Sequence, residues 1–290
     1  MYPILFKLGP LTIYSFGFMM AIAFLVSNYL FSKEAKIRGW DQKHISRMTI
    51  MALLGGVVGS KLFSVFEDWD SFMRDPMGQL FSPSGLTFYG GFILAMVIIL
   101  LYIRSQKLPL KQIVDVLAPI VFLAYGIGRL GCQLAGDGDY GIPTQAPWGM
   151  SYANGTVKPT YAFAEHFERY PEEKIVWKYD SLKAIPAGID DMGHRINEFD
   201  KQTPCHPTPL YEFLFAAIAY QFLKRKRNEY KNLVGKTFAL TLILMGTERL
   251  LVEFLRVNAL YAGLSMAQWI SIALVIGGVY IFTLKPTKKA

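Results

Sequence analysis

The chain has 290 residues, of which 52% are hydrophobic and only 18% are charged. Soluble domains usually carry about a quarter charged residues, so this composition argues against an ordinary soluble enzyme. Two cysteines also argue against a disulfide framework or a CxxC metal site. The formal net charge of +8 would fit a nucleic-acid partner only if the basic residues formed a soluble patch.

Apolar residues gather into seven runs of roughly 20 residues, the length that crosses about 30 Å of hydrocarbon as a helix. The runs are Leu11–Phe31, Met48–Phe66, Gly85–Ile103, Ile113–Leu130, Pro207–Leu223, Thr237–Leu255 and Ser265–Leu284. In the fifth run we expect Thr208 as the N-cap and Pro209 at the first helical position. The first run lacks the cleavage site of a signal peptide. The sequence thus predicts an all-α membrane protein with a bundle of about seven transmembrane helices.

One long segment, Asp137–Cys205, separates the fourth run from the fifth, and aromatic residues are spread among its polar residues. We expect a small folded extracytoplasmic cap here rather than a disordered linker, with a short helix at Tyr161–Tyr170. The predicted organisation is therefore helices 1–4 in residues 1–136, the cap in residues 137–205, and helices 5–7 in residues 206–290.

The basic residues predict the orientation. More than half of the thirty lie in four segments, 32–47, 104–112, 224–236 and the tail after 284, all on one side of the predicted membrane. Cytoplasmic loops concentrate Lys and Arg, so the N-terminus should lie outside and the C-terminus in the cytoplasm of a bacterial inner membrane. These charges would then contact anionic membrane lipids, and no nucleic-acid partner is expected.

Several ionisable residues interrupt the apolar runs or lie at their outer ends. They are Lys61, Arg129, Asp137, Glu212, Glu248, Arg249 and Glu253. Charged groups in a membrane are costly unless they pair or line an aqueous cavity, so each is a functional candidate. Counting along the helices at 1.5 Å per residue places Arg249, Lys61 and Arg129 toward the outer leaflet. Lys61 could also snorkel or pair with an acid.

The sixth run carries Arg249, Glu253 and Arg256 at spacings that place them on one helical face. A structural ladder of ion pairs is one interpretation, and it applies to Glu253 and Glu212. For Arg129 and Arg249 we favour anion binding, because the planar guanidinium matches phosphate oxygens.

Three glycines surround Arg129 in the segment 126–132, and glycines allow a ligand or a neighbouring helix to approach closely. The following segment, 136–141, has the pattern of a tight exposed loop. Asp137 and Asp139 in this loop could suggest Ca²⁺, but the remaining loop ligands and the closing glutamate are missing, so we expect no metal.

These motifs together resemble the prolipoprotein diacylglyceryl transferase family along nearly the whole chain. The matching segments are Thr87-Phe-Tyr-Gly-Gly91, Gly128-Arg129-Leu130-Gly131, His206-Pro-Thr-Pro-Leu-Tyr-Glu212, Arg249-Leu-Leu-Val-Glu-Phe-Leu-Arg256 and Leu264-Ser-Met-Ala-Gln-Trp-Ile270. Each pattern is modest alone, and their joint order on the right runs is highly specific.

Four positions depart from the family pattern. Tyr89 stands where the family has a histidine, Cys132 where it has an asparagine, and Met245 where it has a tyrosine. Asp137 takes the place of a family glutamate. These changes concern the acid–base chemistry more than the fold.

The resemblance implies transfer of the sn-1,2-diacylglyceryl group of phosphatidylglycerol to the lipobox cysteine of a prolipoprotein, without a cofactor. Arg129 and Arg249 would neutralise the departing phosphate. Further substrate contacts would come from Arg256 and Lys61, and orienting roles from Glu212, Glu253, Gly128 and Gly131. The attacking group is a thiolate, so a base is needed, and Tyr89, Asp137 and His206 all remain candidates. His206 could equally serve only at the helix entry.

Two other functions stay open. A divergent family member could bind phospholipid with another acceptor or without catalysis, which the changes at Tyr89 and Cys132 would allow. A transporter or receptor with seven spans is the other alternative, although no internal repeat or interrupted helix supports it.

The two cysteines flank the predicted cap at the same membrane face. Cys132 and Cys205 could form a disulfide in an oxidising compartment, which would hold the two ends of the cap together. They could equally be two separate buried thiols.

Overall fold

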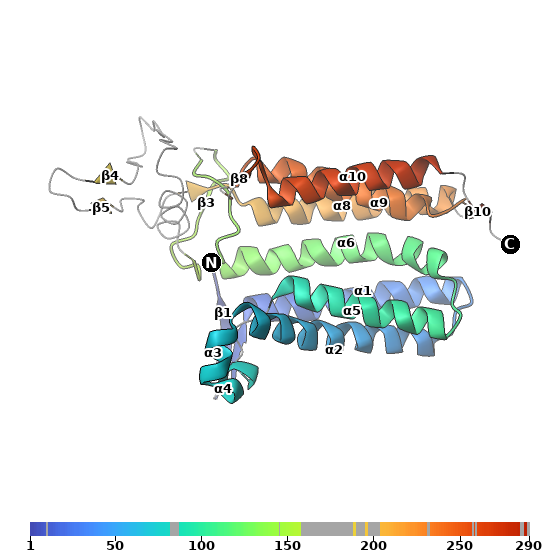
Figure 1. The fold of residues 1–290 in the computed structure, drawn as a ribbon. Coiled ribbons are helices and arrows are strands. Elements are labelled where there is room, and N and C mark those ends of the chain that lie inside the picture. The colour runs from blue at the N-terminus through green and yellow to red at the C-terminus, as the bar shows by residue number, and fades with distance from the viewer. Residues whose placement is uncertain are drawn as a thin grey trace. The chain divides into compact units, whose positions relative to one another are not determined.

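The computed structural model describes residues 1–9, 11–81, 87–144, 146–157, 188–189, 195–196, 204–230, 233–256, 258, 260–284 and 287–288. Long helices make up most of this part of the chain (Figure 1). The chain divides into two compact units. The first unit comprises residues 1–23 and 118–290, and the second unit comprises residues 24–117.

The second unit is built on a pair of long helices. Its elements are most of α1 (Ser15–Ile37), α2 (Gln42–Glu67), α3 (Trp69–Arg74), α4 (Pro76–Phe81), α5 (Phe88–Ser105) and the start of α6 (Leu110–Ala135). Asp41 caps α2, because its side chain accepts a hydrogen bond from the backbone N–H of Lys43. A Cβ on Gly59 would collide with the carbonyl of Gly90, so glycines allow α2 and α5 to pack closely.

The first unit contains the rest of α6 together with three further long helices. These are α8 (Thr208–Glu229), α9 (Lys236–Glu253) and α10 (Met266–Thr283), which lie side by side (Figure 1). Phe122 of α6 forms a buried apolar cluster with Ala216, Ala219 and Leu223 of α8. Leu244 and Met245 of α9 pack against this cluster, so α6, α8 and α9 share one interior.

Short antiparallel strand pairs complete the first unit. They are β1 (Ile4–Leu8) with β2 (Leu11–Tyr14), β3 (Met150–Ser151) with β6 (Pro204–Cys205), β4 (Gly188–Ile189) with β5 (Arg195–Ile196), β7 (Leu233–Val234) with β10 (Thr287–Lys288), and β8 (Leu260–Tyr261) with β9 (Leu264–Ser265). The pair β3–β6 joins two described parts of the predicted cap, residues 146–157 and 204–205. The predicted helix at 161–170 lies outside the described residues.

Each of the seven predicted apolar runs falls on a helix, namely α1, α2, α5, α6, α8, α9 or α10. Within the described residues, α1, α2, α6 and α10 are long and apolar enough to cross a membrane. Large apolar side chains such as Leu25, Leu54, Ile218 and Ile276 are exposed, as expected for a surface that faces lipid. The helical membrane character is confirmed, and the count of seven crossings stays a prediction.

Several predicted boundaries need correction. Leu11–Tyr14 is a strand paired with β1, so the first helix begins at Ser15, and the β-branched Thr12 and Ile13 explain the preference for a strand. The helix α2 begins at Gln42 rather than Met48, because its polar first turns extend beyond the apolar run. The N-cap of α8 is Pro207, and Thr208 is the first helical residue.

Candidate functional site

Glu212 lies at the centre of a polar network in the first unit. Its side chain is in the first turns of α8 and is fully buried. The carboxylate accepts hydrogen bonds from Arg129 Nε of α6, from Arg249 Nη1 of α9 at 2.8 Å, and from the Tyr125 hydroxyl at 2.9 Å. Two guanidinium groups on different helices therefore share one buried carboxylate, the arrangement that makes a buried charge tolerable.

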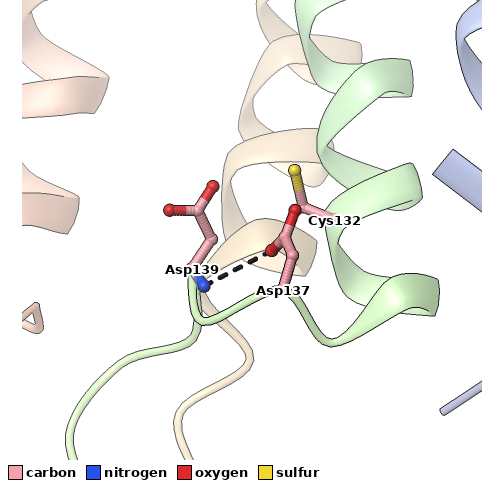
Figure 2. A group of neighbouring side chains, drawn as sticks. All are labelled: Cys132, Asp137 and Asp139. Atoms are coloured by element: carbon pink, nitrogen blue, oxygen red, sulfur yellow. Dashed lines mark hydrogen bonds between the residues drawn. The ribbon is translucent and has the colours of Figure 1, made fainter. Parts of the chain in front are cut away.

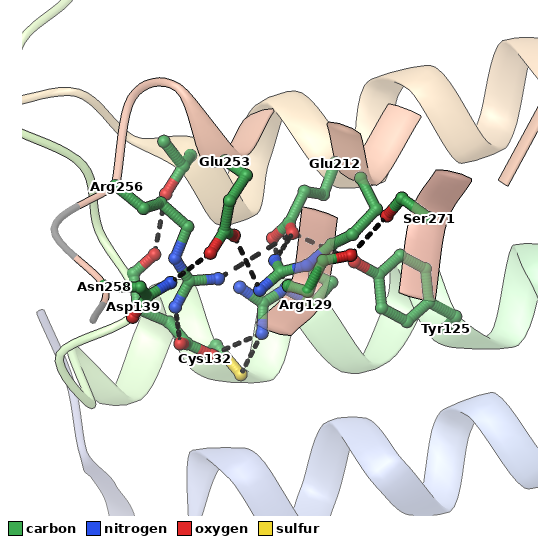
Figure 3. A network of polar contacts seen from close by, with 12 residues as sticks. Tyr125, Arg129, Cys132, Asp139, Glu212, Glu253, Arg256, Asn258 and Ser271 are labelled. Atoms are coloured by element: carbon green, nitrogen blue, oxygen red, sulfur yellow. Dashed lines mark hydrogen bonds and ion pairs between the residues drawn. The ribbon is translucent and has the colours of Figure 1, made fainter. Parts of the chain in front are cut away.

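Asp139 is the second carboxylate of this network. It accepts hydrogen bonds from Arg129 Nη1 and Arg256 Nη2, and Figure 3 shows these side chains pointing toward one another. Burial disfavours the charged form of Asp139, but Arg256 and Arg129 outweigh this effect and hold the pKa of the carboxyl below its usual range. The Thr208 hydroxyl donates to the Asp139 carbonyl at 2.6 Å, which fixes the loop against the start of α8.

Glu253 connects the end of α9 to the start of α10. Its carboxylate lies 3.0 Å from Arg249 Nη2 and accepts hydrogen bonds from Asn258 at 2.6 Å and Ser265 at 2.7 Å. Ser265 is also the N-cap of α10, in a capping box with Gln268. We call these connected charged groups the arginine–carboxylate network. It consists of Arg129, Asp139, Glu212, Arg249, Glu253 and Arg256.

The network is balanced in charge but leaves one donor unused. Three guanidinium groups face three carboxylates, and in the described part of the chain the buried Nη2 atom of Arg129 has no hydrogen-bond partner. A buried polar group left in this state costs about 1–3 kcal/mol. An anionic oxygen at this position would remove that cost.

Among the predicted site residues, the structure brings together Arg129, Arg249, Arg256, Glu212 and Glu253. The ion pairs of Glu212 and Glu253 agree with the structural interpretation of these acids. Arg129 and Arg249 also make ion pairs, so any bound anion must share them with Glu212.

The two glycines beside Arg129 face α1. A Cβ on Gly128 would lie 3.5 Å from Met20 Sδ, and one on Gly131 would lie 3.2 Å from Met19 Cβ. Gly131 therefore allows α1 to pack closely against α6 and so helps to position Arg129, whereas a Cβ at Gly128 would make only an ordinary van der Waals contact.

His206 lies just before α8. Its Nδ1 atom is 3.1 Å from the Tyr211 hydroxyl, which also accepts a hydrogen bond from Trp148 Nε1 at 2.8 Å. Burial lowers the pKa of His206, so the imidazole is neutral at physiological pH and able to accept a proton.

Lys61 and Tyr89 belong to the second unit. Lys61 is in the second half of α2, and Tyr89 is in the first turn of α5. Their expected roles in substrate binding and catalysis stay predictions.

Asp137, Cys132 and Asp139 form a group of possible metal ligands, shown in Figure 2. Their ligand atoms lie within 4.8 Å of one another. However, Asp139 already accepts hydrogen bonds from two guanidinium groups, and Arg129 Nη1 lies 3.6 Å from Cys132 Sγ. A cation here would meet these positive charges, so the group is a poor metal site. Burial raises the pKa of Asp137, which makes this carboxyl a stronger base.

No disulfide joins Cys132 to Cys205, both of which are described and buried. The second of the two interpretations, separate thiols, is therefore correct. Cys132 is on α6 beside Arg129, whereas Cys205 is in β6 and pairs with Met150 of β3. Burial raises the pKa of the Cys205 thiol to about 12.

Sequence reasoning missed Asp139 and Tyr125 as partners of the network. The sequence alone suggests Asp139 only as a possible Ca²⁺ ligand, and the resemblance makes its neighbour Asp137 the counterpart of the family glutamate. The loop pattern of residues 136–141 was visible, but the contact between Asp139 and Arg256 spans 117 residues of sequence. Nothing in a local pattern indicates a pairing over that separation.

An apolar helical chain with partly buried, paired arginines fits a membrane protein that handles an anionic group. The family model described as prolipoprotein diacylglyceryl transferase matches residues 3–284, and the chain belongs to this family.

Curated relatives have the name phosphatidylglycerol–prolipoprotein diacylglyceryl transferase. The protein of Clostridium tetani is 29% identical over 292 residues, which cover 100% of both chains. That of Leptospira interrogans serovar copenhageni is 32% identical over 276 residues, covering 86% of this chain and 72% of the relative. An Escherichia coli O1:K1 protein is 27% identical over 288 residues, covering 96% of this chain and 90% of the relative.

Proposed function

We propose that this protein transfers the sn-1,2-diacylglyceryl group of phosphatidylglycerol to the lipobox cysteine of prolipoproteins, the first step of bacterial lipoprotein maturation. Membership of the family and the names of its relatives support this activity. The observation that carries the proposal is the unused Nη2 donor of Arg129, buried within a network of guanidinium groups. Such a donor suits a phosphate oxygen.

The lipid phosphate would bind at Arg129 and Arg249. The phosphodiester carries one negative charge, and both guanidinium groups meet at Glu212, so a phosphate could contact both. Arg256 would add charge from the Asp139 side, and Lys61 is proposed as a further contact. A cavity of about 270 Å³ beside Glu253 and Arg256, also lined by Asn258 and Ser265, offers room and polar partners for the glycerol headgroup.

In the reaction, the sulfur of the lipobox cysteine attacks the sn-3 carbon of the diacylglyceryl group. A carbon–sulfur bond forms, the carbon–oxygen bond to phosphate breaks, and glycerol 1-phosphate leaves with the electron pair. Negative charge thus grows on the phosphate, where the guanidinium groups of Arg129 and Arg249 stabilise it. The thiol proton passes to a base.

Three residues are proposed as alternatives for this base. His206 is supported by its lowered pKa, which keeps the imidazole neutral. Asp137 is supported by its raised pKa, and Tyr89 by its position in the family motif. A neutral imidazole or a carboxylate of raised pKa matches the requirement for a base that works near neutral pH.

The proposed topology places this site toward the outer leaflet of the inner membrane, with the N-terminus outside and the C-terminus in the cytoplasm. The support is the distribution of basic residues. In spheroplasts, an impermeant maleimide should label Asn154→Cys and should not label Asn228→Cys, two exposed positions. The reverse labelling pattern would overturn the orientation.

Purified protein in phosphatidylglycerol vesicles provides the test of the function. A synthetic lipobox peptide should gain the mass of one diacylglyceryl group, and glycerol 1-phosphate should appear in equal amount. A peptide with serine in place of the lipobox cysteine is the matched control and should remain unmodified. Phospholipid binding without any gain of mass would favour a family member that has lost catalysis, and would reject the proposed reaction.

A further inference from the structure

Glu248 of α9 is a buried acid for which the proposed mechanism has no role. It is 1% exposed, and neither of its carboxyl oxygens has a hydrogen-bond partner among the described residues. Acids are almost never fully buried unless they are paired, and a buried polar atom without a partner is costly. Glu248 therefore needs a physical explanation.

Helical periodicity shows where Glu248 lies. Leu244 and Met245, four and three residues before it, pack against the apolar cluster of α6 and α8, and residues at these spacings share one face of a helix. Glu248 thus faces the interior shared by α6, α8 and α9. It lies one turn further along α9, toward the arginine–carboxylate network.

The charged and titratable groups near Glu248 come from all three helices and from the residues after α9. They are Tyr125 and Arg129 of α6, Glu212 of α8, Arg249 of α9, and Arg256. The three arginines in this group already face Glu212, Asp139 and Glu253. An ionised Glu248 would add a fourth carboxylate to a network that is already balanced.

A buried ionised carboxylate without a partner is unfavourable by several kcal/mol, and such a group usually takes up a proton instead. We propose that Glu248 is a neutral carboxylic acid, and that its neutrality allows the arginine–carboxylate network to take up a phosphate anion. Glu248 is then a positioning residue that acts through Arg249 and Arg129. Only the effect on phosphate binding rests on the proposed function; the neutrality of Glu248 does not.

Ionisation of Glu248 would oppose lipid binding. A phosphodiester brings one negative charge to the network, and a second new charge nearby would repel it in a medium of low dielectric constant. The affinity for phosphatidylglycerol should therefore fall as Glu248 loses its proton at alkaline pH. A merely structural acid would produce no such dependence.

The first measurement is infrared spectroscopy of the purified full-length protein at neutral pH. The wild type should show the carbonyl stretching band of a protonated carboxylic acid, and Glu248→Gln should lose that band. Glu229→Gln, at the exposed end of α8, is the matched control and should retain it. If the wild type and E248Q have the same carboxylic acid bands, the assignment is wrong, whatever the transfer assay shows.

The second measurement is the equilibrium affinity for short-chain phosphatidylglycerol from neutral to alkaline pH. The loss of affinity across this range should be at least about tenfold larger in the wild type than in E248Q. Glu248→Met, which is also neutral, should behave as E248Q does and serves if that variant folds poorly. Equal losses in all three proteins would overturn the positioning role. If E248Q loses the carboxylic acid band as expected but the wild type binds no measurable lipid, the proposed function is contradicted instead.

Discussion

The two units differ in the residues that pack their helices together: the helix pair of the second unit packs through small residues, whereas the interior of the first unit also contains charged residues. The buried residues of α2 are Ile45, Met48, Gly55 and Gly59, and this helix contacts α5 through small residues. The buried residues of α8 and α9 include Glu212, Glu248 and Glu253. Small residues suffice to hold membrane helices together, so the costly charges in the first unit indicate a role beyond packing.

The largest effect on folding is expected from Glu212→Gln. This change removes a fully buried charge that two arginines share, and breaking such a pair costs about 3–5 kcal/mol. Unfolding in mixed micelles should show this loss, whereas Glu229→Gln, at an exposed position of the same helix, should have little effect. If the two variants are equally stable, the buried network does not contribute to stability and the contrast between the units fails.

A smaller effect is expected from Gly59→Val in the second unit. The new side chain would collide with the Gly90 carbonyl and with Leu94, and overpacking usually costs about 1–3 kcal/mol. Gly56→Val is the matched control, since a Cβ at Gly56 meets no atom within 4 Å. The same unfolding assay should separate the two variants. Equal stability would show that α2 and α5 do not need close contact.

Asp139 should make the first unit sensitive to acid. Its pKa is lower in the folded protein than in the unfolded chain, so the folded state binds fewer protons and its stability falls as the pH falls. The stabilisation that Asp139 contributes is fully present above about pH 4, the ordinary pKa of aspartate. It is lost below that pH, as the pH falls toward the pKa of Asp139 in the folded protein. Asp139→Asn should weaken this dependence of unfolding on pH, and an unchanged pH profile would contradict the ion pairs with Arg129 and Arg256.

The smallest effect concerns the reactivity of Cys205. Because burial raises the pKa of its thiol to about 12, alkylation of the folded protein at neutral pH should be slow. Asn154→Cys, at an exposed position, should react quickly in the same sample. After denaturation without reductant, both native cysteines should be alkylated and detected by mass. Rapid labelling of Cys205 in the folded protein would show that β6 is more open than described.

The apolar runs predicted where the long helices of the described residues lie, because length and hydropathy are local properties of the chain. They also indicated Arg129, Arg249 and Glu212, since charges within apolar runs are conspicuous. The hairpin of β1 and β2 was missed because its apolar residues merge with the following helix. The pairing of Asp139 with Arg256 was missed because it depends on how a loop meets the end of α9 in three dimensions.

The role of Arg129 and Arg249 as a clamp for the lipid phosphate is the central claim, and lysine substitution tests it most directly. Arg129→Lys and Arg249→Lys each keep a positive charge but lose the planar fork of donors. Each variant should insert into the membrane and transfer diacylglyceryl to a lipobox peptide at least about tenfold more slowly, a loss of about 1.4 kcal/mol. Arg104→Lys, at an exposed position of α5, is the matched control and should transfer at the wild-type rate. Full activity in both R129K and R249K would contradict the phosphate clamp.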